Sequence, residues 1–268
     1  IEFSLLSRTF VLPFLLFALN FLLKDQYVPS FLLTGLMVNL NLLMANFMLA
    51  AVLVCFMIKF RVIPSKGKIF APLVFLASAA PTFVWKWQSG TGLDLGLRPE
   101  WFNQINSGSL YHVFHLITLK PYLVLTFGGA AAIGLFLISK SSLPQNSITN
   151  NLMLVMGTMI GITVSQIMVT HWLPLTLLVQ LQVSRASIFV LIIAYVSFAG
   201  YLASQWKQSA PQPSWLPLIT GLQWLSLTPL IPFLVLIFKN QLGKIFKHKI
   251  VLAGAIILLL AVNMTVMT

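Results

Sequence analysis

The chain has 268 residues, of which 59% are hydrophobic and only 7% are charged, and sixteen Lys and Arg residues stand against four acids. About a quarter of the residues of a soluble domain are usually charged, so this composition excludes a soluble globular fold. The net charge of +12 fits nucleic acid, anionic lipid or the charge asymmetry of a membrane protein. Because no polar segment is long enough to form a nucleic-acid-binding domain, we expect no nucleic-acid partner.

The apolar residues fall in blocks of about 17 to 25 residues, which is the length that a transmembrane helix needs. Strands of a barrel would alternate apolar and polar residues, whereas residues 250–262 are apolar throughout. We therefore predict an all-α, polytopic integral membrane bundle of about eight transmembrane helices. Residues 1–268 form a single transmembrane domain in this interpretation, and because the chain begins without Met we expect it to be a fragment of a longer one.

The first two predicted spans occupy residues 9–23 and 31–58. Lys24 and Asp25 mark the end of the first span. The second is longer than one perpendicular crossing requires, so we expect it to tilt or to begin with an interfacial turn. Four basic residues follow in a short loop: Lys59, Arg61, Lys66 and Lys68. By the positive-inside rule, this basic loop should face the cytoplasm.

Polar side chains interrupt the second predicted span. They are Asn39, Asn41 and Asn46. Asn side chains in apolar helices more often form hydrogen bonds between helices than line an ion pathway. The single Cys55 lies in the same block, so no internal disulfide can form.

The third predicted span, residues 69–84, ends in Trp85-Lys86-Trp87, and amphipathic rings beside an ammonium suit the level of the lipid headgroups. The longest polar stretch follows at residues 88–120. It lies one crossing away from the basic loop and should therefore face the non-cytoplasmic side. We expect it to be an external loop with an interfacial helix over residues 107–119.

Further apolar blocks predict spans at residues 121–139, 152–170, 186–205, 216–238 and 250–267. Gly157 and Gly161 have the GxxxG spacing that lets helices pack closely in lipid. Residues 171–185 are interrupted by Pro174 and are too short to span, so we predict a broken or re-entrant segment there. A second basic loop, residues 239–249, also has the charge of a cytoplasmic loop. Five simple spans would put the two basic loops on opposite sides. Either the 173–183 segment dips into the membrane, or residues 112–120 contribute, or one basic loop departs from the charge rule. We favour the first alternative, because Pro174 already breaks that region.

The external loop contains the first group of candidate site residues: Asp94, Arg98, Glu100, His112 and His115. On an interfacial helix, His112 and His115 would share a face at spacing i,i+3 and could bind a metal ion or a phosphate. The alternative is that these polar side chains only solvate a loop and anchor a helix.

The predicted break contains the second group: His171, Gln180, Gln182 and Arg185. A guanidinium is costly in hydrocarbon, so Arg185 should face a water-filled cavity, a lipid headgroup or an anionic ligand. If Arg185 lies at the interface, it simply extends its charge to the headgroups. We expect the two groups of residues to form one cavity at a membrane face.

The external loop with an acidic residue, the short spans, the Pro-broken helix and the stretch Gln180-Leu181-Gln182-Val183-Ser184-Arg185 resemble polytopic bacterial membrane proteins of the GT-C glycosyltransferase type. The resemblance implies transfer of a sugar from a polyprenyl-phosphate donor at a membrane face. It places the protein in a bacterial inner membrane, with an organelle membrane as the alternative.

The resemblance also implies roles for the candidate residues. Asp94 or Glu100 would be the general base. The candidates for binding phosphate or lipid are Arg98, His112, His115, Lys120, His171, Gln180, Gln182 and Arg185. In that family the catalytic acid sits in the first external loop, which in this chain falls near Asp25 or before Ile1.

Two other classes of function remain open from the sequence. The protein could be a non-catalytic subunit of a larger membrane complex, with His112, His115 or His171 contacting lipid, pigment or partner helices, and the scarcity of acids fits this. A transporter is the third alternative, although the two halves of the chain show no inverted repeat. No motif indicates a particular cofactor or metal.

Overall fold

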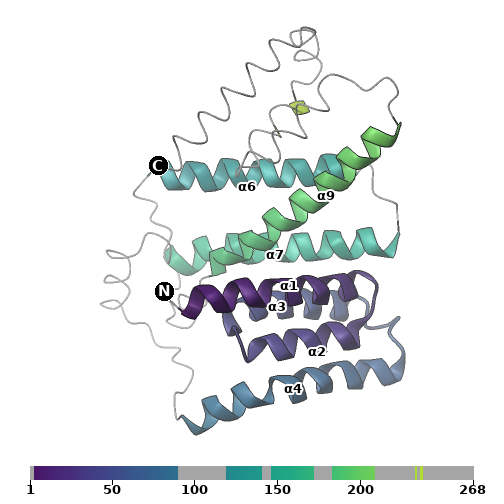
Figure 1. The fold of residues 1–268 in the computed structure, drawn as a ribbon, viewed down its shortest axis with the longest axis vertical. Coiled ribbons are helices and arrows are strands. Elements are labelled where there is room, and N and C mark those ends of the chain that lie inside the picture. Colours follow the sequence, from purple (N-terminus) through teal and green to yellow (C-terminus); the bar gives the residue numbers. More distant parts are fainter. Residues whose placement is uncertain are drawn as a thin grey trace. The chain divides into compact units, whose positions relative to one another are not determined.

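The computed structural model (Figure 1) describes residues 3–89, 119–140, 146–171 and 183–208, together with Phe233, Leu236 and Ile237. This part of the chain contains seven α-helices and one 3-10 turn, so the predicted all-α class is confirmed. The chain divides into two compact units, Ile1–Ile117 with Gln145–Phe189 and Thr118–Pro144 with Val190–Thr268.

Helix α1, Phe3–Leu23, is the first predicted span and ends in a tight turn. The N–H of Gln26 donates to the carbonyl of Phe21 over 2.9 Å, and the N–H of Asp25 donates to Leu22 over 3.0 Å. This pair of bonds is the Schellman arrangement, which needs a left-handed residue after the helix. Asp25 fills that position with φ of 59°, where Gly is the usual residue, so the turn fixes the direction of its carboxylate.

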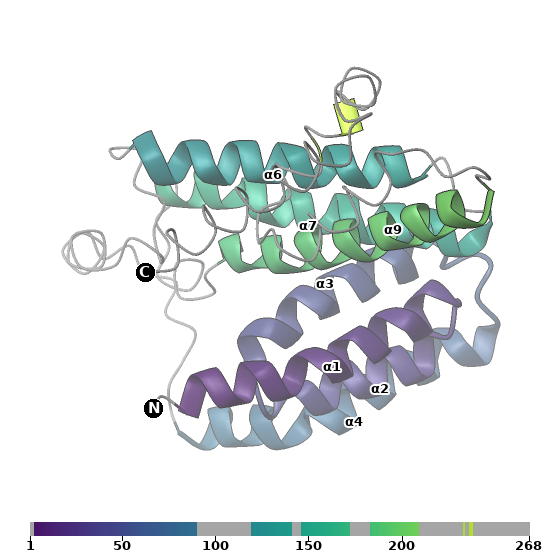
Figure 2. The same cartoon turned by 45° about the horizontal axis from the view of Figure 1, so that its top comes forward.

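The predicted single span over residues 31–58 is wrong, because two helices occupy it. Helix α2, Tyr27–Val38, and helix α3, Leu42–Ile58, are about 18 and 25 Å long at 1.5 Å per residue. The chain reverses between them at Asn39 to Asn41, and the Oδ1 atom of Asn41 accepts the N–H of Met44 over 3.1 Å to cap α3. The two ends of residues 27–58 therefore lie at the same end of the first unit (Figure 2).

Helix α2 is the centre of the first unit and contacts α1, α3 and α4. The hydroxyl of Ser30 donates to the carbonyl of Ala18 over 2.9 Å, which joins α2 to α1. The buried ring of Phe31 lies edge-on to Phe56 of α3 and to Phe75 of α4, with centroids 5.5 and 6.2 Å away. Edge-to-face pairs of this kind add to the energy of simple burial, so α2 carries much of the core.

Helix α4, Ser65–Gln88, approaches α2 closely at Gly35. A Cβ atom at Gly35 would lie 2.0 Å from Ser78 Oγ and 2.9 Å from the carbonyl oxygen of Phe75. Only a residue without a side chain therefore fits there.

Asn39 joins the same two helices beside Pro81 of α4. Its Nδ2 atom donates to the carbonyl of Ser78 over 2.8 Å, and its Oδ1 atom accepts from the N–H and the hydroxyl of Thr82 over 3.1 and 2.8 Å. The amide thus spans one turn of α4 next to a proline, where helical hydrogen bonds are weakened. The prediction that Asn39 bonds between helices is confirmed.

Helix α7, Ser147–His171, completes the first unit against α1 and α3, and the 3-10 turn η1, Val183–Ala186, contacts α7 and α3. At Gly157 and Gly161 an added Cβ atom would meet nothing within 4 Å. Among the described residues the GxxxG spacing therefore brings no helix into close contact, contrary to the packing role that we expected.

The second unit contains α6, Leu119–Lys140, and most of α9, Ser187–Gln208. Its core is a cluster of buried side chains: Leu135, Phe198, Tyr201, Leu202 and Leu236. A Cβ atom at Gly134 would lie 2.3 Å from the ring of Phe233, so this glycine admits a ring against α6.

The predicted spans at residues 69–84, 121–139 and 152–170 lie within helices α4, α6 and α7, and the span at 186–205 lies within α9 except for Ala186, the last residue of η1. Three helices of the described part are long and apolar enough to cross a membrane, namely α4, α7 and α9. The predicted spans at 216–238 and 250–267 and the basic loop at 239–249 fall outside the described residues, apart from three positions.

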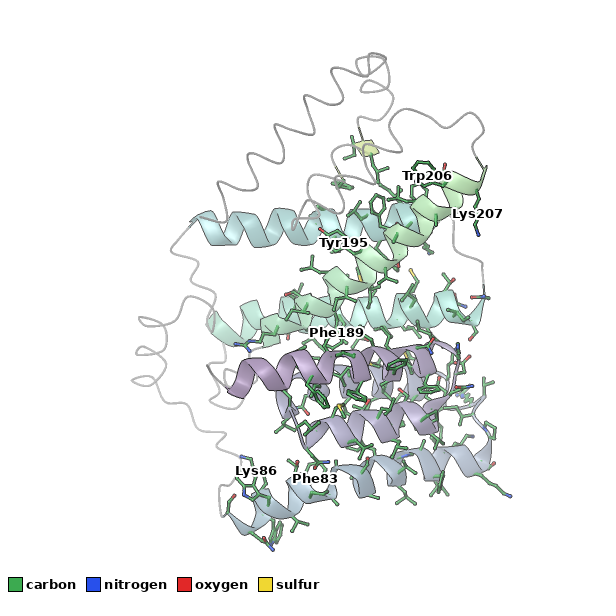
Figure 3. All side chains as sticks on the ribbon, viewed as in Figure 1. Phe83, Lys86, Phe189, Tyr195, Trp206 and Lys207 are labelled. Carbon is green, nitrogen blue, oxygen red and sulfur yellow. The ribbon has the colours of Figure 1, made fainter. Side chains whose placement is uncertain are left out.

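The surface of α4 supports a membrane setting. Only 17% of its most apolar window is buried, and Trp85 and Trp87 at its end are 64% and 88% exposed. Figure 3 shows Phe83 and Lys86 at that same end of the helix. Exposed rings beside an ammonium at the end of an apolar helix are typical of the lipid headgroup level.

Candidate functional site

Most of the site residues predicted from the sequence lie outside the described residues: Asp94, Arg98, Glu100, His112, His115, Gln180 and Gln182. Lys120 lies in the first turn of α6, His171 is the last residue of α7, and the half-buried Arg185 lies in η1. Whether these groups share one cavity with the external loop stays a prediction.

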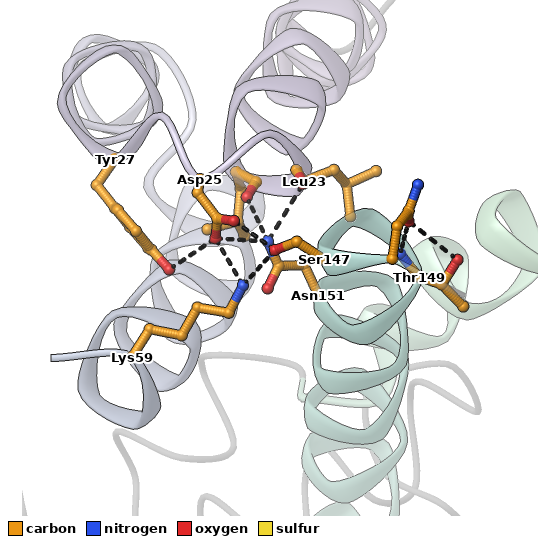
Figure 4. A network of polar contacts seen from close by, with 9 residues as sticks. Leu23, Asp25, Tyr27, Lys59, Ser147, Thr149 and Asn151 are labelled. Atoms are coloured by element: carbon orange, nitrogen blue, oxygen red, sulfur yellow. Dashed lines mark hydrogen bonds and ion pairs between the residues drawn. The ribbon is translucent and has the colours of Figure 1, made fainter. Parts of the chain in front are cut away.

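A different set of polar side chains comes together at one end of the first unit (Figure 4). We call it the Asp25 cluster: Asp25, Tyr27, Lys59, Ser147 and Asn151. Its members come from the turn after α1, the start of α2, the end of α3 and the first two turns of α7. The contacts join residues as much as 126 positions apart in the chain.

Lys59 follows the last residue of α3, and its ammonium makes two contacts in the cluster. It lies 2.7 Å from Asp25 Oδ1 and 2.7 Å from Ser147 Oγ. The hydroxyl of Ser147 in turn donates to the second carboxylate oxygen of Asp25. An ammonium has three N–H donors, and these two contacts use two of them.

Helix α7 presents Ser147 and Asn151 on one face, because residues four apart are neighbours on a helix. Asn146 caps the helix by accepting the N–H of Thr149 over 3.1 Å. The carboxylate of Asp25 contacts Ser147 and Asn151. It therefore lies at the positive end of the α7 dipole, where negative charge is stabilised.

Asn151 ties α7 to the end of α1. Its buried Nδ2 atom donates to Asp25 Oδ1 over 2.9 Å and to the carbonyls of Leu22 and Leu23 over 3.1 and 3.2 Å. The last carbonyls of a helix lack partners within the helix. Asn151 thus satisfies the end of α1 and the carboxylate with one amide.

The hydrogen bonds of the cluster decide the charge of Asp25. Partial burial alone would raise the pKa of Asp25, but hydrogen bonds from Lys59, Ser147 and Asn151 and the positive charge of Lys59 outweigh it, so the pKa lies below its ordinary value. Hydrogen bonds to the ionised form have this effect. The carboxylate is therefore ionised at neutral pH.

A cavity of about 560 Å³ adjoins the cluster. Asp25, Lys59 and Ser147 line its polar end, and the rest of the lining includes Val28, Ile63 and Pro64. Its size falls in the range of small-molecule sites, which combine an apolar lining with a few polar groups.

The wall is formed by the turn after α1, the starts of α2 and α7 and the loop between α3 and α4. The basic side chains Arg61, in that loop, and Lys66, in the first turn of α4, are exposed. The cavity therefore suits a ligand with an apolar body and an anionic group.

Sequence reasoning missed this site. Asp25 follows the first span directly, and an acid at the end of an apolar run is a visible signal in a chain with only four acids. Its pairing with Lys59 was hidden because a single span over residues 31–58 would separate the two. Ser147 and Asn151 gave no sequence signal, since polar residues at the start of a helix are usually caps.

No three His, Cys, Asp or Glu side chains gather in the described part of the chain to hold a metal ion. Comparisons with protein-family models, with curated proteins and with solved structures found no match. The chemistry of the cavity and its polar cluster is therefore the feature of the protein that indicates a function.

Proposed function

We propose that this chain is an integral membrane protein of about eight spans that binds a phosphate-bearing lipid in the cavity beside the Asp25 cluster and transfers a sugar from a polyprenyl-phosphate donor. The observation that carries the binding proposal is the amphipathic cavity itself. Its apolar wall ends at Lys59 and Ser147, an ammonium and a hydroxyl that can both donate to a phosphate oxygen.

The charge around the polar end of the cavity favours an anionic ligand. Asp25 is the acid of the cavity and is paired with Lys59 over 2.7 Å. Three exposed basic residues lie nearby: Lys24 in the turn after α1, Arg61 in the loop between α3 and α4, and Lys66 in the first turn of α4. An excess of positive charge at a cleft raises the local concentration of anions, which offsets the repulsion between Asp25 and a phosphate.

The transfer step gives Asp25 a role in this proposal. A general base must be ionised before it accepts a proton from an acceptor hydroxyl, and the lowered pKa of Asp25 meets that requirement. The GT-C resemblance expects its acid in the loop after the first span, where Asp25 stands. Asp94 and Glu100 are the alternative bases in the external loop.

Native mass spectrometry of the protein purified in mild detergent tests the binding of a phosphate-bearing lipid. We expect a bound phosphate-bearing lipid on the unmodified protein and on Lys86→Met, whose charge lies at the far end of α4. The double variant Asp25→Asn/Lys59→Met should lose it, and because both charges are removed together no unpaired ion is left to unfold the protein.

Each other outcome has a definite meaning. Absence of any phosphate-bearing lipid from the unmodified protein, or equal retention by the double variant, contradicts the proposed binding. Stable co-purifying subunits without such a lipid favour the alternative of a non-catalytic subunit. If a polyprenyl-phosphate sugar is retained, Asp25→Asn should keep the lipid and lose transfer, whereas unchanged transfer would rule out Asp25 as the base.

A further inference from the structure

An open groove adjoins the cavity of the Asp25 cluster. It has a volume of about 600 Å³ and lies between the start of α2 and the first turns of α4. Val28 and Gly67 line both spaces. The groove therefore begins where the amphipathic cavity ends.

The chemistry of the groove changes along one face of α4. Lys66, Phe70 and Leu73 follow one another at spacings of four and three, which places them on the same side of the helix. Lys66 lies at the end of the groove near the cavity. The exposed side chains of Ile69, Phe70 and Leu73 line the groove farther along α4. Over about 10 Å along the helix axis the lining thus passes from charged to apolar.

Gly67 keeps the junction between the two spaces open. A Cβ atom at this position would lie 3.2 Å from Cγ2 of Ile63, a side chain that lines the cavity. A larger residue would therefore fill the junction. The junction is bounded by Val28 of α2 and Gly67 of α4. A passage bounded by one residue on each side suits a single hydrocarbon chain rather than two.

We propose that the groove holds the single hydrocarbon chain of a lipid phosphate whose headgroup binds at Lys59. This inference rests on the proposed binding of a phosphate-bearing lipid in the adjoining cavity. Hydrocarbon gains little by leaving the bilayer for an apolar groove, so the phosphate at Lys59 supplies the affinity and the groove orients the chain. The charged-to-apolar order of the lining matches the order of groups in such a lipid.

The experiment uses a monoalkyl phosphate with a photoreactive diazirine near the end of its chain, added to the full chain in lipid nanodiscs. Peptide mass spectrometry then locates the crosslinks. We expect labelling at residues 69–73 that excess unlabelled monoalkyl phosphate suppresses and an alkyl alcohol of equal length does not. The alcohol control separates a bound lipid from general exposure of α4 to the bilayer.

A matched pair of variants tests the path of the chain. Gly67→Leu should remove most of the suppressible labelling at residues 69–73, because its side chain fills the junction and keeps the hydrocarbon chain out of the groove. Gly161→Leu, on an exposed face of α7 where a Cβ atom meets nothing, should leave it unchanged. Gly67→Leu should still bind butyl phosphate, which shows that the protein is folded and that the headgroup site is intact.

The contrary outcomes are distinguishable. Suppressible labelling that persists at residues 69–73 in Gly67→Leu, or that falls only on other helices, overturns the groove and leaves phosphate binding at Lys59 standing. If the unmodified protein shows no suppressible labelling and binds no butyl phosphate, the proposed function itself fails together with this inference.

Discussion

The ammonium of Lys59 lies 2.7 Å from the carboxylate of Asp25, 34 residues earlier in the chain, because α2 and α3 reverse direction between them. One straight helix over residues 31–58 would be about 42 Å long and would hold the two charges on opposite membrane faces. The reversal therefore creates the candidate site, and the turn at residues 39–41 is its precondition.

The left-handed backbone of Asp25 can be measured separately from its carboxylate. Asp25→Gly and Asp25→Ala both remove the hydrogen bonds of the cluster, but only Gly adopts φ of 59° without strain. We expect Asp25→Ala to be less stable than Asp25→Gly by about 1 to 2 kcal/mol, the cost of a left-handed conformation for a residue with a side chain. Thermal unfolding of both variants in one detergent measures the difference, and equal stability would contradict the assigned turn.

The pH dependence of stability should report the charge of Asp25. Its pKa is lower in the folded protein than its ordinary value, so the carboxylate stabilises the fold at neutral pH, and that contribution is lost as pH falls through the folded pKa. Because the side chain is 37% exposed, solvent screening limits the contribution to about 0.2 to 1 kcal/mol.

The comparison is between the unmodified protein and Asp25→Asn, which cannot titrate at this position. Their difference in unfolding free energy should be constant near neutral pH and should shrink below about pH 4. A difference that grows on acidification would show that the cluster stabilises the protonated carboxyl instead.

The close approach of α2 and α4 predicts a strong effect at Gly35. Gly35→Ala would place a methyl group against Ser78 Oγ and the backbone of Phe75, and overpacking of this kind usually costs about 1 to 3 kcal/mol. Gly161→Ala on the open face of α7 is the matched control and should not destabilise. Chemical denaturation of both variants gives the comparison. A neutral Gly35→Ala would mean that α2 and α4 lie farther apart.

Asn39 should stabilise the turn of α4 beside Pro81. Asn39→Ala removes three hydrogen bonds to Ser78 and Thr82, and we expect the free energy of unfolding to fall by about 2 kcal/mol, since each such bond contributes about 0.5 to 1.5 kcal/mol net.

Thr82→Val supplies the partial control, because it removes only the hydroxyl contact. It should therefore cost less than Asn39→Ala in the same thermal assay. An Asn39→Ala variant as stable as the original protein would show that the amide adds nothing to the α4 turn.

The helices that the sequence predicted correctly share one property. Residues 69–84 and 186–205 are apolar runs whose ends are marked by Trp and Lys residues, and both lie within single helices. Length and charge set such boundaries because lipid forces a helix to satisfy its own backbone. Composition alone was therefore enough for these elements.

The reversal at residues 39–41 could not be predicted in that way. Leu40 stands between Asn39 and Asn41, so the mean hydropathy hardly changes where the chain turns. Asn39 was correctly interpreted as an interhelical contact, but its place at the end of α2 depends on its tertiary partners Ser78 and Thr82. The bond from Met44 to Asn41 is instead a local cap of α3. Ser147 and Asn151, like Asn39, depend on tertiary partners, because only the packing of α7 on α1 and α3 brings them to Asp25.

One disagreement follows from the reversal. The GT-C resemblance expects the acid after the first span on the external face, whereas the basic loop that begins at Lys59 predicts the cytoplasmic face. Since Asp25 and Lys59 form an ion pair, both residues must share one face. The side of the membrane on which the cavity opens is therefore measurable at either residue.

The most direct test is cysteine labelling from the two sides of sealed membranes with a membrane-impermeant maleimide. Single cysteines at the exposed positions Lys24 and Arg61, in a Cys55→Ala background, should both react from the same side. Reaction of Lys24→Cys and Arg61→Cys from opposite sides would restore a single span over residues 31–58 and would contradict the site at Asp25 and Lys59.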